Sequence, residues 1–562
     1  MYSIAKNIQF VIALLKKHNI KRLVLSPGGT NAPFIRGVQD DSFFTCYSVV
    51  DERSALYFAI GLYLTTGEPI AVCCTSAQAT RNYIPGLTEA FYKHVPILAI
   101  TFSKHYRFIG QEYMQAPNQT SLPVDCVRKS YALPYVSNSE DEKYCVRLAN
   151  EAMLEILHNV PAPVQLCVPM LDNELGLDVE CDLPEVKVIR RYFKEDVNKA
   201  DLTGKRVLLV VGENRGIEDS VIEQFAHNSN TCIYVNHLSN MRNRYTIFGN
   251  LLLSIISQDE FDKNFAPDIL ITIGGQTGDY PLYHKLAESN VCFEHWRISL
   301  DGDIVDTYDH LTRVYECTVS EFFMNLKQSH TNNEYYEVWA KAVEDMTVDI
   351  ELPLSNALAA QLLYKAIPED SYVNFAILNS LRIWNLFPIQ NRVKCFSNVG
   401  AFGIDGGLST FIGQSVEMNN LCFMIIGDLA FFYDMNSLGI RHIKNNIRII
   451  LVNNAGGIEF KLGSSAEENK RIDRFIAGGG HYKDADGWAS SNGFDYMRIT
   501  DEIQLSNSVN KIVSPSEKPI LIEIITTDLN DGRAYQKLLD TNKKNNCSSM
   551  RIFASKIKHK LF

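Results

Sequence analysis

The sequence predicts an α/β fold made of three doubly wound, parallel-sheet domains. Short apolar runs of strand length alternate with helix-like stretches along most of the 562 residues. Polar segments divide these alternations into three groups. We therefore expect residues 1–180, 190–330 and 350–530 to form the three domains, and residues 531–562 to form a C-terminal tail.

The composition is that of an ordinary globular protein, with 46% hydrophobic and 21% charged residues. A formal net charge of −11 argues against a broad nucleic-acid surface. Near the start, Ile4, Ile8, Val11 and Leu14 have helical spacing with lysines among them, which predicts an amphipathic helix rather than a signal peptide. No apolar run reaches membrane-spanning length, so we expect no membrane contact.

The cysteines indicate a reducing compartment. The chain has 13, an odd number, and none forms a CxxC pair. They are scattered through predicted strands, as at Cys73, Cys167 and Cys422. A disulfide framework or a zinc site is therefore not expected, and we predict a cytoplasmic protein.

The first group begins with apolar runs at residues 23–25, 70–74, 96–101 and 164–168, which predict strands separated by helix-like stretches. A polar connector at about residues 172–198 follows. These features favour a first parallel sheet that ends before the connector.

The middle group opens with KRVLLVVGENRG at residues 205–216. A glycine turn after a strand is one feature of nucleotide-binding sites. This turn lacks the G-x-G-x-x-G pattern and an acidic residue at the expected distance, so a structural role is favoured. A polar segment near residues 327–336 predicts the linker to the third group.

The third group holds the most informative pair of strand ends. An apolar run at residues 421–426 stops at Gly427-Asp428, and a second run at residues 447–452 stops at Asn453-Asn454. Parallel strands of such a unit end at the same edge of the sheet, which places Asp428 beside Asn454. The helix-like segment between them directs four apolar side chains toward a core: Met435, Leu438, Ile440 and Ile443.

The residue types at this edge suit a magnesium and phosphate site. Asp428 offers a carboxylate and Asn454 an amide oxygen, and a free backbone carbonyl lies nearby. Mg²⁺ usually shares such ligands with phosphate, to which the helix after Gly427 offers its N-terminus. Taken singly, Asp428 as a helix cap and Asn453-Asn454 as a polar turn are the simpler interpretations.

The pair GD and NN, each after an apolar strand, resembles the signature of the thiamine-diphosphate enzymes. The resemblance implies thiamine diphosphate and Mg²⁺ as cofactors. It implies that Asp428, Asn454 and the carbonyl of Gly456 bind the metal, with Gly427 and Leu429 beside the diphosphate. It also implies three doubly wound domains of that enzyme type, the central one often without a cofactor.

Glu52 lies at a strand-to-helix junction in the first group, between TCYSVV and SALYFAIG. An acidic residue at a helix N-terminus interacts favourably with the helix dipole, whether or not it has another function. The resemblance implies a catalytic and cofactor-binding role, because thiamine chemistry needs a carboxyl group that donates to the pyrimidine ring. Glu52 and Asp428 lie in different domains, so the resemblance implies a site shared between subunits of a homodimer or homotetramer.

Longer segments narrow the resemblance to the 2-succinyl-5-enolpyruvyl-6-hydroxy-3-cyclohexene-1-carboxylate synthases, the MenD family. They include SPGGTNAPF at residues 26–34, CCTSAQATRNYIPGLTEA at residues 73–90 and SNVGAFGIDGGLST at residues 397–410. Members decarboxylate 2-oxoglutarate and add the acyl carbanion to isochorismate. The resemblance implies that Ile404 is an apolar wedge under the cofactor, that Gly403 and Asp405 line it, and that Gln115 is a catalytic residue facing the substrate.

The sequence departs from the family where substrate carboxylates bind. Thr30, Val399, Trp384 and Lys104 replace four arginines of the family's motifs. Because bidentate arginine is the usual clamp for a carboxylate, these losses predict a divergent specificity. The remaining candidate substrate residues are Asn82, Lys104, Gln115, Arg382 and Glu459.

Glu459 replaces an apolar residue that in the family sits over the cofactor's thiazolium ring. A carboxylate there would disfavour an anionic second substrate, serve as an acid or base, or point into solvent. We therefore predict an enzyme that decarboxylates a 2-oxo acid and joins the product to an acceptor. The alternatives are a simple non-oxidative 2-oxo acid decarboxylase and a catalytically silent relative that binds the cofactor.

Overall fold

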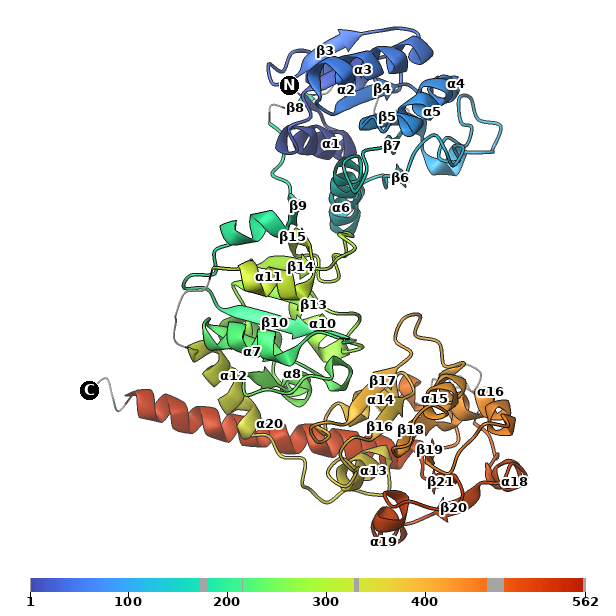
Figure 1. The fold of residues 1–562 in the computed structure, drawn as a ribbon. Coiled ribbons are helices and arrows are strands. Elements are labelled where there is room, and N and C mark those ends of the chain that lie inside the picture. Colours follow the sequence, from blue (N-terminus) through green and yellow to red (C-terminus); the bar gives the residue numbers. More distant parts are fainter. Residues whose placement is uncertain are drawn as a thin grey trace. The chain divides into compact units, whose positions relative to one another are not determined.

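The chain forms two compact units. The computed structural model describes residues 2–171, 179–180, 182–214, 216–327, 333–461 and 480–558. One unit contains residues 1–192 and 301–316, and the other contains residues 193–300 and 317–562. Figure 1 shows three groups of strands along the sequence, in blue, green and orange to red, each accompanied by helices.

The first sheet has six parallel strands within the described residues, in the order β3-β2-β4-β5-β7-β6. Their bounds are β2 Arg22–Leu25, β3 Thr45–Ser48, β4 Ile70–Cys74, β5 Ile97–Lys104, β6 Ser130–Ala132 and β7 Val164–Met170. The four strands predicted from apolar runs are confirmed.

Helices pack against both faces of this sheet. They are α1 Lys6–Lys17, α2 Ala32–Gln39, α3 Glu52–Thr66, α4 Gln78–Asn82, α5 Ile84–Tyr92 and α6 Ser139–Glu155. Successive strand residues point to opposite faces. Ala71 and Cys73 of β4 therefore pack in one core with α1, α2 and α6, whereas Ile70 and Val72 pack in another with α3 and α5. The predicted doubly wound arrangement is confirmed for this sheet.

The predicted connector at residues 172–198 contains regular structure. Strand β8, Val179–Glu180, pairs antiparallel with β1, Tyr2–Ser3, and β9 covers Arg190–Phe193. The second unit then opens with parallel strands in the order β12-β11-β10-β13-β14. Their bounds are β10 Val207–Val211, β11 Thr231–Tyr234, β12 Thr246–Ile247, β13 Ile269–Ile273 and β14 Glu294–Ile298.

The glycine turn after β10 packs against the turn after β13. A Cβ on Gly212 would lie 1.8 Å from the carbonyl oxygen of Gly275. The N–H of Gly275 donates to the carbonyl of Glu213 over 2.9 Å. Backbone therefore fills the space in front of this turn, which supports the structural role favoured from its sequence.

The third sheet repeats the strand order of the first. Within the described residues its six parallel strands are ordered β17-β16-β18-β19-β21-β20. The strand bounds are β16 Tyr372–Phe375, β17 Lys394–Ser397, β18 Cys422–Gly427, β19 Ile447–Asn453, β20 Asp495–Ile499 and β21 Ile520–Ile525. The helices that position the site are α13 Asn356–Leu363, α14 Asn379–Trp384, α15 Gly407–Ser415, α16 Asp428–Asp434 and α20 Asp528–Lys558. The predicted tail therefore begins inside helix α20.

The predicted strand-helix-strand unit is present, with one correction. β18 and β19 pair in parallel with Gly427 opposite Val452, and α16 and a 3₁₀ turn at Met435–Gly439 lie between them. Leu438 is buried, and Met435 and Ile443 pack against the core. The prediction for Ile440 is wrong: this side chain is 39% exposed, because the helical segment ends one residue before it.

Two further expectations concern the whole chain. No helix among the described residues is long and apolar enough to cross a membrane. The cysteines in the described parts of the chain have free thiols, most of them buried, and Cys73, Cys167 and Cys422 lie in strands.

Candidate functional site

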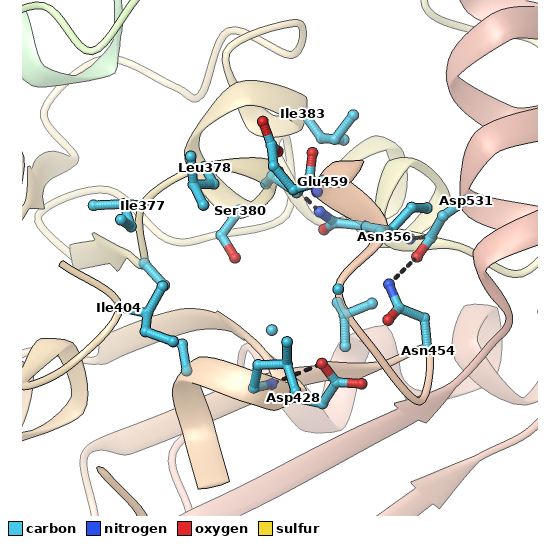
Figure 2. A pocket seen from close by; sticks show the side chains of 18 of the residues that line it. Asn356, Ile377, Leu378, Ser380, Ile383, Ile404, Asp428, Asn454, Glu459 and Asp531 are labelled. Atoms are coloured by element: carbon cyan, nitrogen blue, oxygen red, sulfur yellow. Dashed lines mark hydrogen bonds between the residues drawn. The ribbon is translucent and has the colours of Figure 1, made fainter. Parts of the chain in front are cut away.

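A cavity of about 260 Å³ lies at the carboxyl ends of the third sheet's strands (Figure 2). The segments that follow β16, β18 and β19 form its wall, together with the first turns of α13 and α20. β16 pairs with β17 on one side and with β18 on the other, so the strand order reverses at this point. Ligands of open α/β sheets bind at such switch points, which makes this cavity the candidate active site.

Asp428 connects the ends of β18 and β19. It begins α16 and is 3% exposed. Its Oδ1 accepts a hydrogen bond from the N–H of Leu429 over 2.7 Å, and its Oδ2 accepts one from the N–H of Gly456 over 3.0 Å. Nε2 of His481 lies 3.2 Å from the same Oδ2. Burial raises the pKa of Asp428, although the two N–H donors and His481 favour its charged form.

The amide of Asn454 is held in one orientation by a buried carboxylate. Its Nδ2 donates to Oδ2 of Asp531 over 2.9 Å, as the dashed line in Figure 2 shows. Asp531 also accepts from the N–H of Asn356 over 2.8 Å, and burial raises the pKa of Asp531 to about 6. Within the described residues, Oδ1 of Asn454 is buried without a hydrogen-bond partner. This oxygen is therefore available to a ligand.

Hydrogen bonds of Asn453 hold the turn that contains Asn454 in place. Oδ1 of Asn453 accepts from the N–H of Ala455 over 3.1 Å, and Nδ2 donates to Oε1 of Glu523 over 2.6 Å. Glu523 is fully buried and also accepts from the N–H of Ala485 and the hydroxyl of Tyr496. Such a network fixes the turn that presents Asn454 to the cavity.

Ile404 lines the cavity on the side opposite Asn454 in the view of Figure 2. It lies between β17 and α15, in the segment where a Cβ on Gly403 would come within 2.5 Å of Oδ1 of Asp405. A larger residue at this position would require the Asp405 side chain to move. Gly403 and Asp405 flank Ile404 but are not among the residues that line the cavity.

Arg382 and Glu459 form a bidentate ion pair. Nη1 and Nη2 of Arg382 donate to the two carboxylate oxygens of Glu459 over 2.9 and 2.8 Å. Glu459 lines the cavity, on the side away from Asp428 in Figure 2. Of the three possibilities for Glu459, the structure shows a neutralised carboxylate at the cavity wall rather than a free group in solvent.

The donor set at Asp428 suits a hard cation. A buried carboxylate, an amide oxygen that has no partner among the described residues and the turn at Gly456 meet at one edge. No group of three or more His, Cys, Asp or Glu in the described residues could hold a metal ion. The predicted ligands are of another kind, one carboxylate with amide and carbonyl oxygens, and they fit Mg²⁺ shared with a diphosphate.

Glu52 lies in the first unit, at the first position of α3. Asp51 caps this helix by accepting from the N–H of Ser54 over 2.8 Å. Nδ2 of Asn82 donates to Oε2 of Glu52 over 3.0 Å. Asn82, a predicted substrate residue, is therefore a direct partner of the predicted catalytic acid.

Two further predicted residues of the first unit lie in different surroundings. Gln115 belongs to an exposed loop and has φ of 58°, whereas Lys104 is buried at the end of β5. Buried Gln119, which the sequence reading missed, ties this region together. Its side chain accepts from the N–H of Ala77 and donates to the carbonyl of Phe102.

The positions that have lost an arginine are buried. Thr30 shares a hydrogen bond with Ser76 over 3.0 Å. Val399 is packed in the core, and the indole of Trp384 donates to Oδ1 of Asn356 over 3.1 Å. These three side chains pack inside the fold and carry no charge, whereas Lys104, the fourth replacement, keeps a cation at the end of β5.

Sequence reasoning missed Asp531, Asn356 and His481. Asp531 follows β21 in the polar segment TTDLNDG, and a polar segment after an apolar strand is the signal that could have found it. Asn356 follows a helix-capping Ser355, which hides its role. His481 has no sequence signal, because only folding brings it to Asp428.

Comparisons with known proteins define the class of the chain. Residues 6–122 match the family model "Thiamine pyrophosphate enzyme, N-terminal TPP binding domain". This segment contains Glu52, and together with the full-length relatives it shows a thiamine-diphosphate-dependent enzyme.

Similar full-length proteins identify the family within this class. A 2-succinyl-5-enolpyruvyl-6-hydroxy-3-cyclohexene-1-carboxylate synthase of Bacteroides thetaiotaomicron is 34% identical over 95% of this chain and 98% of its own length. One of Phocaeicola vulgatus is 36% identical over 94% of this chain and 96% of its own length. A synthase of Flavobacterium psychrophilum is 27% identical over 93% of this chain. The chain belongs to the family of these synthases.

Proposed function

We propose that the chain uses thiamine diphosphate and Mg²⁺ to decarboxylate a 2-oxo acid and to join the remaining acyl group to a second small molecule. The observation that carries this proposal is the open oxygen of Asn454 beside buried Asp428 at the sheet's switch point. The full-length relatives are 2-succinyl-5-enolpyruvyl-6-hydroxy-3-cyclohexene-1-carboxylate synthases. We propose the same reaction type here with a divergent choice of substrates.

Asp428, Asn454 and the carbonyl of Gly456 would hold the metal, and the cavity floor at Gly427 and Leu429 would adjoin the diphosphate. When bound, thiamine diphosphate supplies the carbon that attacks a 2-oxo acid. Asp531 accepts from Nδ2 of Asn454, which would leave Oδ1 of Asn454 for the metal. Ile404 supplies an apolar surface for the cofactor between the two ends of the cavity.

Glu52 would hold a proton against a ring nitrogen of the cofactor, and Asn82 keeps one of its carboxyl oxygens in place. Gln115 and Lys104 are the proposed substrate residues of this unit. Gly403 and Asp405 shape the segment that presents Ile404.

We propose that the chain forms a homodimer or a pair of homodimers. Helix α3, which begins with Glu52, exposes Tyr57, Phe58 and Leu64 to the extent of 46%, 42% and 63%. An apolar helix face of this kind is suited to a second copy of the chain. Sedimentation velocity of the wild type would show a monomer if this proposal is wrong.

The test is release of carbon dioxide from a panel of 2-oxo acids, with thiamine diphosphate and Mg²⁺ present. Products formed with and without isochorismate separate ligation from simple decarboxylation. Glu52→Gln is the matched inactive variant. If the wild type releases no more carbon dioxide than Glu52→Gln from any acid, the protein is a silent binder and the proposed reaction is wrong.

A further inference from the structure

The turn after β4 holds Ala77 in a backbone conformation that normally requires glycine. Ala77 has φ of 72° and ψ of −126°, close to the first central residue of a type II′ turn. Glycine adopts these angles freely, whereas a Cβ makes them strained. Helix α4 begins at the next residue and ends at Asn82, which donates to Glu52. The conformation of Ala77 therefore determines the direction of the short helix that carries Asn82.

The buried side chain of Gln119, which is 1% exposed, holds this turn. Its Oε1 accepts from the N–H of Ala77 over 3.0 Å. Its Nε2 donates to the hydroxyl of Thr80 over 2.6 Å and to the carbonyl of Phe102 over 3.1 Å. One amide thus joins the strained residue to the helix that follows it and to the end of β5, where Lys104 lies.

The backbone on either side of this amide is also held in place. The carbonyl of Gln119 accepts from Nε2 of Gln165, a fully buried residue of β7, over 3.0 Å. Nη2 of Arg81 in α4 donates to the carbonyl of Asn118 over 2.7 Å. Buried polar networks whose members are paired in this way are rigid. The loop that contains Gln115 is therefore fastened to α4 at its end.

A strained backbone conformation persists only where its surroundings hold it. Without the amide of Gln119, the N–H of Ala77 loses its acceptor and Ala77 can relax to a negative φ. Helix α4 would then change direction and take Asn82 away from Glu52. Glycine at position 77 would keep the turn without this support, because it has no strain to release.

We infer that Gln119 is a positioning residue for the proposed reaction: its amide keeps Ala77 in the strained turn, and the turn keeps Asn82 in contact with Glu52. This inference rests on the proposed function, in which Glu52 is the catalytic acid. Gln119 acts through the backbone of Ala77 rather than through a proton of its own.

The experiment is a rescue test with Gln119→Met and Ala77→Gly, singly and combined. Methionine has a flexible side chain of similar length but does not replace the two hydrogen bonds to the turn and to Thr80. Carbon dioxide release is measured with thiamine diphosphate, Mg²⁺ and the 2-oxo acid that the wild type uses best. Gln119→Met should lower kcat about 10- to 100-fold, the size expected when a reacting group is misplaced.

The glycine variant distinguishes positioning from general stabilisation. Ala77→Gly alone should keep kcat within about twofold of the wild type, because glycine adopts the same turn. Combined with Gln119→Met, it should bring kcat back to within about threefold of the wild type, since the turn no longer needs the amide. Loss of packing around Gln119 would not be repaired by a change at position 77.

Gln165→Met is the matched control. It removes a buried amide of the same network that contacts Gln119 and Thr101 but not Ala77. Ala77→Gly should therefore restore no kcat that Gln165→Met loses. Circular dichroism shows whether each variant is folded. If Gln119→Met alone does not fold, the combined variant should still fold and turn over, and its failure to fold would overturn the inference.

Hydrogen exchange gives a readout without turnover. The amides of residues 78–83 should exchange at least about tenfold faster in Gln119→Met than in the wild type, and the combined variant should reverse this change. If the wild type decarboxylates no 2-oxo acid, the proposed function fails and exchange alone decides the inference. If Gln119→Met turns over like the wild type, or if Ala77→Gly restores neither kcat nor exchange, the positioning role is overturned and the proposed function stands.

Discussion

The first and third sheets have the same strand order, but the space at the switch point is filled in the first sheet and open in the third. Numbered from its own first strand, each reads 2-1-3-4-6-5. In the third sheet the ends of β16 and β18 border an open cavity. In the first sheet the corresponding loops touch, since a Cβ on Gly28 would lie 2.4 Å from Cβ of Thr75. The same topology thus makes a binding cavity in one sheet and a packed edge in the other.

The difference lies in a few residues at the strand ends. The third sheet places a carboxylate at its edge, with an amide oxygen that no described residue contacts by a hydrogen bond, whereas the first sheet places Thr30 and Ser76 there and pairs their hydroxyls. The first sheet's candidate acid, Glu52, follows a different strand, β3. We therefore expect substitutions in the third sheet to affect binding, and substitutions at Glu52 to affect turnover.

Glu52→Gln should have the largest effect on turnover. Removing a general acid typically lowers the rate about 10²- to 10⁴-fold, while the affinity for thiamine diphosphate should change less than about tenfold. Steady-state carbon dioxide release and calorimetry measure the two effects separately. Asp51→Asn, which keeps the helix cap, is the matched control and should leave turnover unchanged. Loss of cofactor binding in Glu52→Gln would contradict the expectation that Glu52 affects turnover and the third sheet affects binding.

Asp531→Asn should weaken the metal site without a direct contact to it. The amide of an asparagine at position 531 can rotate, so that it no longer holds the Asn454 amide in one orientation. Loss of a residue that orients a metal ligand typically lowers metal affinity about 10- to 100-fold. Mn²⁺ titration followed by electron paramagnetic resonance measures this. Asp528→Asn, in the same helix, should bind Mn²⁺ like the wild type. Equal affinity in both variants would show that Asp531 only stabilises the fold.

The first unit should lose stability in mild acid through His18. Burial lowers the pKa of His18 to about 4, and Nε2 lies 2.9 Å from Oδ1 of Asn150. Between about pH 6.5 and pH 4 the unfolded chain binds the extra proton, so stability falls as the pH falls through this window.

The expected loss for the first unit between pH 7 and pH 5 is about 2 kcal/mol. Denaturant unfolding at both pH values measures it, and His18→Gln, which can still bond to Asn150, should flatten the dependence. A wild-type-like slope in His18→Gln would assign the acid sensitivity to other groups.

Much of this architecture was predictable from local patterns. The apolar runs gave the strands, and the two polar strand ends gave Asp428 and Asn454, because a parallel sheet brings its carboxyl ends together. Ile440 was placed wrongly because a 3₁₀ turn ends the helical period at Gly439. Short irregular turns leave no periodic signal.

The partners of the site residues were not predictable. Arg382 and Glu459 were both candidate substrate residues, but their pairing depends on where α14 and the turn after β19 meet. Asp531 reaches Asn454 only because α20 begins beside that turn. Contacts between residues far apart in the chain are set by tertiary packing, which neither periodicity nor spacing records.

The most direct test of the account is calorimetric titration of thiamine diphosphate into the wild type and Asp428→Ala, each with and without Mg²⁺. The account predicts binding by the wild type that requires Mg²⁺, and at least about 100-fold weaker binding by Asp428→Ala, because a metal-bridged diphosphate loses its carboxylate ligand. Asp528→Asn should bind like the wild type. Equal, Mg²⁺-independent binding by the wild type and Asp428→Ala would contradict the assignment of this cavity.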